Sequence, residues 1–190
     1  MKRRQFLHGV GTAGVLSFSA SAQPEETRPV SRVTIQVVVN GVKQSIQVAV
    51  EETLAELIRN RLGLHGVKIA CNQAACGACT VLLDERPVYS CHLLAIQADG
   101  HTVTTIEGLA KNGHLHPLQE EFIAHDGLQC GFCTPGMILS CAATLARKPD
   151  ATRSEIAEGI AGNSCRCGAY LGILDAAEAA RGRLKGGASQ

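Results

Sequence analysis

Tryptophan is absent from this 190-residue chain, and aromatic residues make up only 3% of it. A surface that binds single-stranded nucleic acid by stacking needs several exposed aromatic rings, so the composition argues against one. An excess of one charge is also missing, because 18 lysines and arginines stand against 17 aspartates and glutamates. Proteins that bind a polyanion usually carry a basic field. We therefore expect no nucleic-acid partner.

Cysteine is missing from the first 70 residues, and nine cysteines then follow between positions 71 and 167. That number is below the density of disulfide-stapled miniproteins but high for an ordinary enzyme. Hydrophobic residues at 45% and charged residues at 18% are typical of a packed globular chain. The clustered cysteines indicate bound metal or disulfides, and their spacing must decide between the two.

The first 22 residues have the features of an export signal. The pair Arg3-Arg4 is followed by Phe6 and Leu7 and then by an uncharged, mildly apolar run up to Ala20. This run is too short and too polar for a confident membrane span. Arg-Arg-x-Phe-Leu resembles a twin-arginine signal, and Ala20-Ser21-Ala22 resembles a cleavage site. We expect a mature chain without a membrane span, exported folded to the periplasm; an ordinary basic N-terminus and an uncleaved anchor remain alternatives.

Two units follow a short linker at residues 23–31. In residues 32–109, two alternating β-branched runs flank the hairpin turn Asn40-Gly41, and apolar residues at helical spacing then cover Thr53–Leu62. This unit is therefore predicted to be α+β, with a twisted sheet. Residues 113–184 have almost no strand pattern and predict a small helical domain, followed by a tail at 185–190. The further predicted strands are Thr80–Asp84, Val88–Tyr89 and His101–Ile106, and the predicted helices are Pro117–Ala124, Pro135–Ala146, Arg153–Ile160 and Tyr170–Arg181.

The first group of cysteines has the spacing C-x4-C-x2-C with a fourth cysteine eleven residues later. Plant-type ferredoxins hold a 2Fe–2S cluster with this spacing. Three thiolates on one tight loop can wrap two irons, and small neighbours such as Ala74 and Gly77 let backbone N–H groups approach the sulfurs. The candidate ligands of this first set are Cys71, Cys76, Cys79 and Cys91.

The second group combines a C-x2-C pair with a C-x-C pair, both between predicted helices. Four thiolates from two loops could hold a second cluster, and taken alone they could also bind tetrahedral zinc or form disulfides. Cys141 is the ninth cysteine; it lies inside a predicted helix and is interpreted as a small buried hydrophobic residue. The candidate ligands of this second set are Cys130, Cys133, Cys165 and Cys167.

Together the motifs resemble the iron–sulfur subunit of the xanthine oxidase/aldehyde oxidoreductase family of molybdenum hydroxylases. The likeness covers about residues 32–181, and the leader with Cys167-Gly-Ala-Tyr170 is most similar to periplasmic aldehyde oxidoreductase small subunits. Two departures, Ala74 and Gly168-Ala169, stand where family members often have Gly and Thr-Gly, and neither removes a ligand. The resemblance rests on the stretches Cys71–Val81, Gln129–Met137, Gly162–Cys167, Thr104–Leu109, His116–Gln119 and Ser154–Ile156.

The resemblance implies a β-grasp ferredoxin domain followed by an all-α four-helix-bundle domain, each with one 2Fe–2S cluster. It also implies a large molybdopterin-binding subunit, with FAD on a further subunit in many members or a cytochrome c acceptor in some exported relatives. Electrons would pass one at a time from molybdenum through the helical-domain cluster and then the ferredoxin-domain cluster to that acceptor. Gln129 matches a residue that contacts the pterin, and Phe132 and Met137 are expected on or beside the same surface.

On this interpretation the chain is an electron-transfer subunit with no catalytic residue for the substrate. The complex would oxidise an aldehyde to a carboxylic acid, with a heteroaromatic C–H as the alternative substrate. A free-standing exported ferredoxin would need only the first domain. A zinc or disulfide interaction module is the other competing hypothesis.

Overall fold

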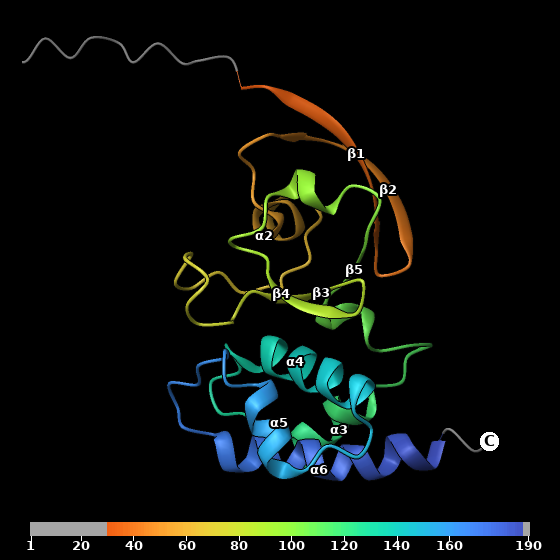
Figure 1. The fold of residues 1–190 in the computed structure, drawn as a ribbon, viewed down its shortest axis with the longest axis vertical. Helices are drawn as coiled ribbons and strands as arrows, with labels where there is room; N and C mark the ends of the chain where they lie inside the picture. The colour runs from red at the N-terminus through yellow and green to blue at the C-terminus, as the bar shows by residue number, and fades with distance from the viewer. Residues whose placement is uncertain (1–29, 188–190) are drawn as a thin grey trace, which may run out of the picture.

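A computed structural model of the chain describes residues 30–187. The expected export signal at residues 1–22, most of the linker and residues 188–190 of the predicted tail lie outside the described residues. The fold has two parts, which are stacked in Figure 1. We call the elements from the first strand to Gly108 the sheet domain, and the four helices that follow the helical domain.

The sheet domain begins with the predicted hairpin. Strands β1 (Arg32–Val39) and β2 (Val42–Ala49) pair antiparallel, with Val39 opposite Val42. Asn40 and Gly41 form the turn at φ values of 50° and 84°. Positive φ at both central residues gives a turn whose twist matches the right-handed twist of the strands. The Asn40-Gly41 turn therefore fixes the register of the whole hairpin.

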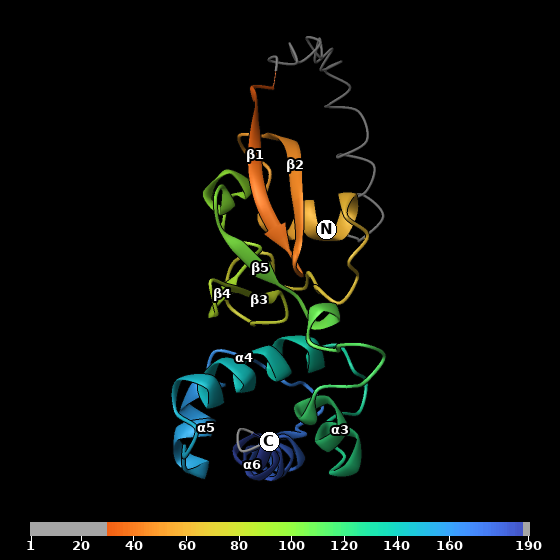
Figure 2. The same ribbon diagram turned by 90° about the vertical axis from the view of Figure 1, so that its right-hand side faces the viewer.

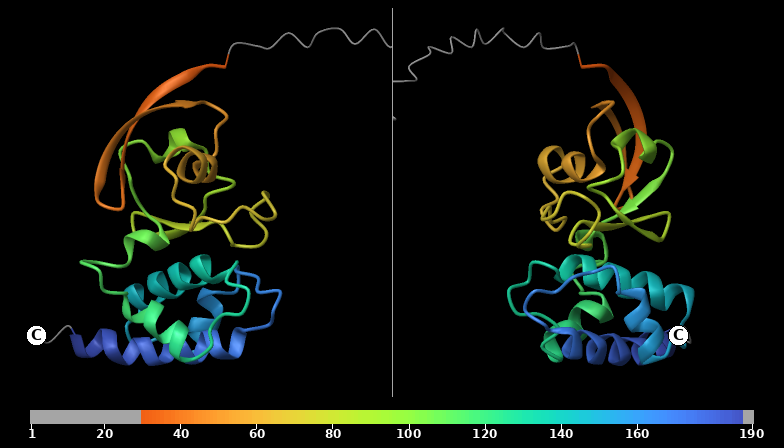
Figure 3. Two further views of the ribbon diagram at one scale, coloured as in Figure 1. Left: turned by 180° about the vertical axis from the view of Figure 1, so that it is seen from behind. Right: turned by 60° about the vertical axis from the view of Figure 1, so that its left-hand side comes forward.

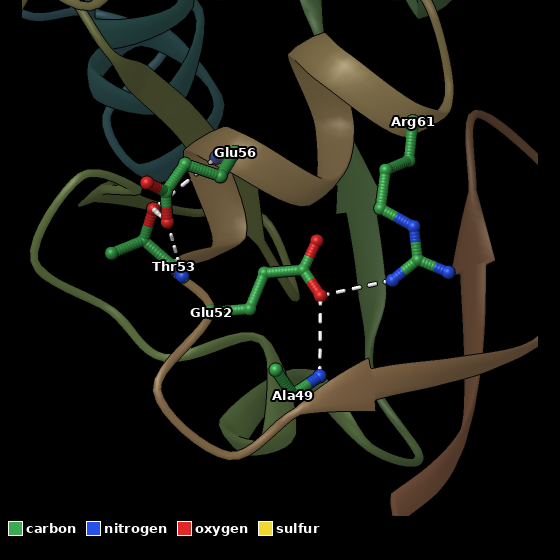
Figure 4. A network of polar contacts seen from close by, with 5 residues as sticks. All are labelled: Ala49, Glu52, Thr53, Glu56 and Arg61. Atoms are coloured by element: carbon green, nitrogen blue, oxygen red, sulfur yellow. Dashed lines mark hydrogen bonds and ion pairs between the residues drawn. The ribbon is translucent and has the colours of Figure 1, made fainter. Parts of the chain in front are cut away.

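A short helix follows the hairpin and differs from the predicted helix at Thr53–Leu62. Helix α2 (Leu54–Glu56) passes directly into a wider π-helical turn, η1 (Leu57–Arg61), in which the Leu62 N–H donates to the Leu57 carbonyl. Thr53 and Glu56 cap each other's backbone N–H groups, as Figure 4 shows. Such a reciprocal cap fixes the start of the helix.

The capping region is also tied to the hairpin. Glu52 accepts hydrogen bonds from the Ala49 N–H and from the Arg61 guanidinium, so the end of β2 and the end of η1 meet at one carboxylate (Figure 4). Because the Arg61–Glu52 pair is partly exposed, its contribution to stability is small.

The sheet has five strands in the order β2-β1-β5-β3-β4, with β1 and β5 parallel and the other pairs antiparallel. This mixed sheet curves around α2 and η1, which is the β-grasp arrangement that the resemblance implies (Figure 2). Fully buried side chains of Leu54, Leu57 and Ile58 fill the concave face. The remaining elements are β3 (Thr80–Leu83), β4 (Arg86–Tyr89), η2 (Ala95–Ala98), β5 (Thr102–Thr104) and η3 (Ile106–Gly108).

The helical domain contains the four predicted helices, but the last one continues beyond its predicted end at Arg181 to Gly187 and so includes the first part of the predicted tail. They are α3 (Pro117–Ala124), α4 (Thr134–Arg147), α5 (Arg153–Gly159) and α6 (Tyr170–Gly187). Thr152 caps α5 in a reciprocal pair with Glu155, and His116 caps α3. The core includes the buried side chains of Phe122, Ile156 and Ile173. Within residues 30–187, no helix is long and apolar enough to cross a membrane.

The two domains pack through α4, which lies beneath β3 and β4 (Figure 2). Leu82 of β3 contacts Leu139 and Ala143 of α4 in a small apolar cluster between the two main cores. The loop before β3, in yellow, and the loop before α6, in blue, extend on the same side of the molecule in both views of Figure 3. These two loops carry most of the candidate ligands.

Candidate iron–sulfur centres

The hairpin β3–β4 brings the two ends of the first cysteine set together. Cys79 directly precedes β3 and Cys91 follows β4 by one residue, and the pairing of Thr80 with Tyr89 places them side by side. The Ser90 hydroxyl donates to the Cys79 carbonyl at 2.6 Å and fixes this corner. Cys79 and Cys91 are only 2% and 5% exposed.

The loop of residues 70–79 carries the other two thiols of this set and turns its amides towards sulfur. The Ala75 N–H donates to Cys71 Sγ at 3.3 Å, and the Ala74 N–H donates to Cys91 Sγ at 3.4 Å. Backbone donors, led by that of Gln73, lower the pKa of the Cys71 thiol to about 6. Hydrogen bonds of this kind stabilise thiolates and tune the potential of a bound cluster.

Ala74, one of the two departures from the family pattern, adopts a strained backbone. Its φ is +57°, in the left-handed region that glycine enters without cost. For alanine this conformation costs about 1–2 kcal/mol. The loop nevertheless keeps its amide aimed at Cys91 Sγ, so the substitution adds strain and leaves the thiol positions in place.

The second set is built from the two loops at one end of the helical domain. Cys133 is the residue before α4, and Cys130 lies three positions earlier. Cys165 and Cys167 lie in the loop between α5 and α6, where the Cys165 N–H donates to the Tyr170 hydroxyl at 2.8 Å. The N-terminus of the 14-residue α4 faces this region, and its dipole favours the negative charge of bound thiolates.

In both sets the thiols approach one another in two pairs. Cys71 contacts Cys76 and Cys79 contacts Cys91 in the first set; Cys130 contacts Cys167 and Cys133 contacts Cys165 in the second. Two thiols on each side suit a dinuclear centre with two thiolates per iron. This pairing and the backbone N–H donors at the first set fit a 2Fe–2S cluster.

Burial opposes ionisation at the inner thiols. It raises the pKa of Cys79 to about 11 and that of Cys133 to about 12. Coordination to a metal ion reverses this preference, because a coordinated thiol is held deprotonated. The outer thiols are easier to ionise: the Phe132 N–H lowers the pKa of Cys130. Loading of either site therefore releases protons from the buried thiols.

The two sets meet around one cavity. Its volume is about 410 Å³, and Cys76 of the first set and Cys130, Cys133 and Cys165 of the second all line it. Across this region the Ser164 N–H donates to the Cys76 carbonyl at 2.9 Å. This hydrogen bond joins the backbone of Cys76, in the first set, to the residue directly before Cys165, in the second set.

The remaining predicted residues divide between surface and core. Gln129 and Phe132 are exposed, and Phe132 keeps 44% of its area in contact with solvent. Met137, which was expected on or beside that surface, is fully buried. It lies on the face of α4 that packs into the helical core, so the expectation is wrong for Met137. Cys141 is also fully buried in α4, and it belongs to neither set.

Sequence reasoning missed the polar residues between the two sets. Asn163 and Ser140 are 5% and 2% exposed and are hydrogen bonded to each other at 2.8 Å. The signal that could have indicated Asn163 is its place two residues before Cys165, inside a stretch quoted above for its cysteines alone. Ser140 lies within an apolar helix and gives no such signal.

Comparison with known proteins assigns a family to each of the two parts of the chain. Residues 37–110 match the family described as a 2Fe-2S iron-sulfur cluster binding domain, and residues 105–178 match the family described as a [2Fe-2S] binding domain. Each match contains one complete set of four candidate ligands. The matches favour clusters over zinc or a disulfide framework, and all nine cysteines are free thiols in the structure.

Two relatives are subunits that this chain matches over most of their length. The nicotine 6-hydroxylase small subunit of Paenarthrobacter nicotinovorans is 44% identical over 156 residues, covering 82% of this chain and 94% of the relative. The aldehyde oxidoreductase iron-sulfur-binding subunit PaoA of Escherichia coli K12 is 40% identical over 181 residues, covering 87% and 79%.

A solved structure agrees with these relatives. A chain of quinoline 2-oxidoreductase from Pseudomonas putida 86 is 40% identical and superposes with a TM-score of 0.78, covering 82% of this chain and 98% of that one. The chain described above belongs to the xanthine oxidase/aldehyde oxidoreductase family of molybdenum hydroxylases, as an electron-transferring small iron–sulfur subunit with two 2Fe–2S binding domains.

Proposed function

We propose that this chain carries electrons from a large molybdopterin-binding subunit to an acceptor, in a complex that oxidises aldehydes to carboxylic acids. The acceptor is an FAD-binding subunit or a cytochrome c. The observation that carries the aldehyde assignment is the match to PaoA, an aldehyde oxidoreductase subunit, over 87% of this chain. The sequence of the leader, with its twin arginines, is consistent with the periplasmic form of such a complex.

The chemistry that two bound 2Fe–2S clusters supply is one-electron reduction and oxidation. This chain's residues hold and separate the two sites. Cys71, Cys76, Cys79 and Cys91 would hold one cluster, and Cys130, Cys133, Cys165 and Cys167 would hold the other. Backbone N–H groups of residues 74 and 75 donate to thiol sulfurs, while the β3–β4 hairpin keeps the buried thiols away from water.

The partner face for the molybdopterin subunit is proposed to surround the second cysteine set. Cys130 and Cys167 are exposed there, together with Gln129. Large apolar side chains are exposed on the same loops or at the start of α6: Leu128, Phe132, Tyr170 and Leu171, the last at 74%. Exposed apolar groups at such a density mark interfaces more often than free surface. Gln129 would contact the pterin from this face.

A heteroaromatic substrate is the second candidate. It is favoured by the relative named a nicotine 6-hydroxylase small subunit, at 44% identity, and by the quinoline 2-oxidoreductase structure. The test is to co-express the chain with the molybdopterin-binding subunit of its complex and to assay the purified complex with aldehydes and with nicotine and quinoline. Oxidation of the aldehydes to carboxylic acids, with nicotine and quinoline left unchanged, supports the proposal. Hydroxylation of the heteroaromatic rings without aldehyde oxidation would overturn it.

A further inference from the structure

The side chain of Asn163 crosses from one domain to the other between the two cysteine sets. Asn163 lies two residues before Cys165 and is 5% exposed. Its Nδ2 donates to the carbonyl of Gly77, the residue that directly follows Cys76, at 2.9 Å. One buried amide therefore connects the loop of the first set to the loop of the second.

The orientation of this amide is fixed by its partners. A backbone carbonyl can only accept, so the NH2 end must face Gly77 and the oxygen must face away. The Ser140 hydroxyl donates to Asn163 Oδ1 at 2.8 Å from within α4. Thr80 Oγ1 is a second acceptor for Nδ2 at 3.1 Å and itself donates to the Gly77 carbonyl at 2.7 Å. Both ends of the amide are thus hydrogen bonded.

Packing is tight on the side of the amide that faces Gly77, while a small cavity of about 100 Å³ borders Asn163 and Ser140 on another side. A Cβ atom added to Gly77, whose φ is +68°, would lie 2.6 Å from Asn163 Nδ2. A Cβ atom added to Gly136 of α4 would lie 2.4 Å from the Gly77 carbonyl oxygen. Backbone, amide and helix therefore meet directly. Movement of Asn163 Nδ2 towards Gly77 would push the cysteine loop directly, since no flexible side chain lies between them.

Directly beside this amide is the contact that brings the two sites together. Ser164, the next residue, donates its N–H to the Cys76 carbonyl at 2.9 Å. Asn163 and Ser164 thus hold Gly77 and Cys76 with two adjacent hydrogen bonds. The bond from the Asn163 side chain is buried, whereas a further cross-domain bond nearby, from the Tyr89 hydroxyl to the Gly162 carbonyl, is exposed.

We propose that Asn163 is a positioning residue for electron exchange between the two clusters. By anchoring Gly77, it keeps the Ser164–Cys76 contact short and fixes the separation of the two sites. Ser140 supports this role by holding the amide in its orientation. The proposal rests on the two-cluster electron-transfer function and is independent of the substrate and of the final acceptor.

The test is Asn163→Asp in the complex with the partner subunits. The substitution keeps the size and the acceptor for Ser140, but it replaces the donor with an oxygen that repels the Gly77 carbonyl. Both clusters should remain loaded, because no thiol is lost. The magnetic splitting between the two reduced clusters in low-temperature EPR spectra should shrink, and electron re-equilibration after rapid reduction should slow. The control Tyr89→Phe removes the exposed cross-domain bond and should leave both measurements unchanged.

A second variant covers the case in which Asn163→Asp does not fold. Ser140→Ala leaves the Nδ2–Gly77 bond in place and frees only the oxygen, so it should change the splitting and the rate less, in the same direction. The proposal is overturned if Asn163→Asp keeps the wild-type splitting and rate with both clusters present. Where Asn163→Asp does not fold, the same result for Ser140→Ala overturns it. It is also overturned if Tyr89→Phe changes the splitting and the rate as much as the tested variant does. Fewer than two cluster signals in the wild-type complex would instead refute the two-cluster function itself.

Discussion

Gly136 of α4 offers a direct test of how closely the two domains meet. In Gly136→Ala, the new Cβ would lie 2.4 Å from the Gly77 carbonyl oxygen, and the nearest approach that real Cβ atoms make is about 3.0 Å. The helix or the cysteine loop must therefore move by at least about 0.6 Å. Forced displacement in a packed interior costs about 1–3 kcal/mol. Alanine also gains about 1 kcal/mol in helix propensity over glycine, which offsets part of that cost.

A matched glycine separates these two effects. Gly182 is exposed in α6, and a Cβ atom added there meets nothing within 4 Å. Gly182→Ala should therefore stabilise the protein by about 0.5–1 kcal/mol through propensity alone. The difference between the two variants isolates the clash at about 1–3 kcal/mol.

Urea unfolding of the cluster-loaded protein, followed by circular dichroism, measures this difference. With a dependence of about 1–3 kcal/mol per molar urea, the midpoint of Gly136→Ala should lie on the order of 1 M below that of Gly182→Ala. The Gly136 variant should also show a changed EPR interaction between its clusters. Equal midpoints for the two variants would refute the close contact between α4 and the Gly77 loop.

Three further predictions concern a histidine, a helix cap and the leader. His116 Nδ1 accepts a hydrogen bond from the Leu118 N–H at the start of α3, and burial lowers the pKa of this histidine. The folded state therefore binds fewer protons than the unfolded state below pH 6.5. Stability should fall as the pH drops from 6.5 through the lower folded pKa, and His116→Asn should remove this dependence in thermal unfolding; an unchanged profile would contradict the cap. Thr152→Ala should cost about 1 kcal/mol in urea unfolding, because it removes the cap of α5. The Lys148 ammonium and, after it, this cap lower the pKa of Glu155 to about 2. Replacing Arg3 and Arg4 with lysine should leave the loaded protein in the cytoplasm, as fractionation and immunoblotting would show; unchanged export would exclude the twin-arginine route.

Much of the fold could be predicted because local signals agree with tertiary packing. Asn40-Gly41 can form only a few kinds of turn, and the structure confirms the predicted hairpin. Thr152 and Glu155 form the reciprocal cap that marks the start of α5. The cysteine spacing predicts that each set lies on loops around one site, and in the structure the thiols of each set lie on loops at the ends of β3, β4, α4 and α6.

The rest depends on contacts between residues far apart in the sequence. Met137 belongs to the same motif as the exposed residues Gln129 and Phe132, but its place on α4 directs its side chain into the helical core. The π-helical turn at Leu57–Arg61 breaks no propensity rule, and so the apolar spacing alone predicted an ordinary helix. Asn163 acquires its role only when Gly77, 86 positions earlier, is brought against it.

The central claim is that this chain holds two separate 2Fe–2S clusters with eight cysteines. Iron and acid-labile sulfide should be measured in the anaerobically purified complex, together with the EPR spectrum after reduction. Two clusters require about four irons and four sulfides per chain and two distinct rhombic signals. Zinc in place of iron, or about two irons with one signal, would contradict the account.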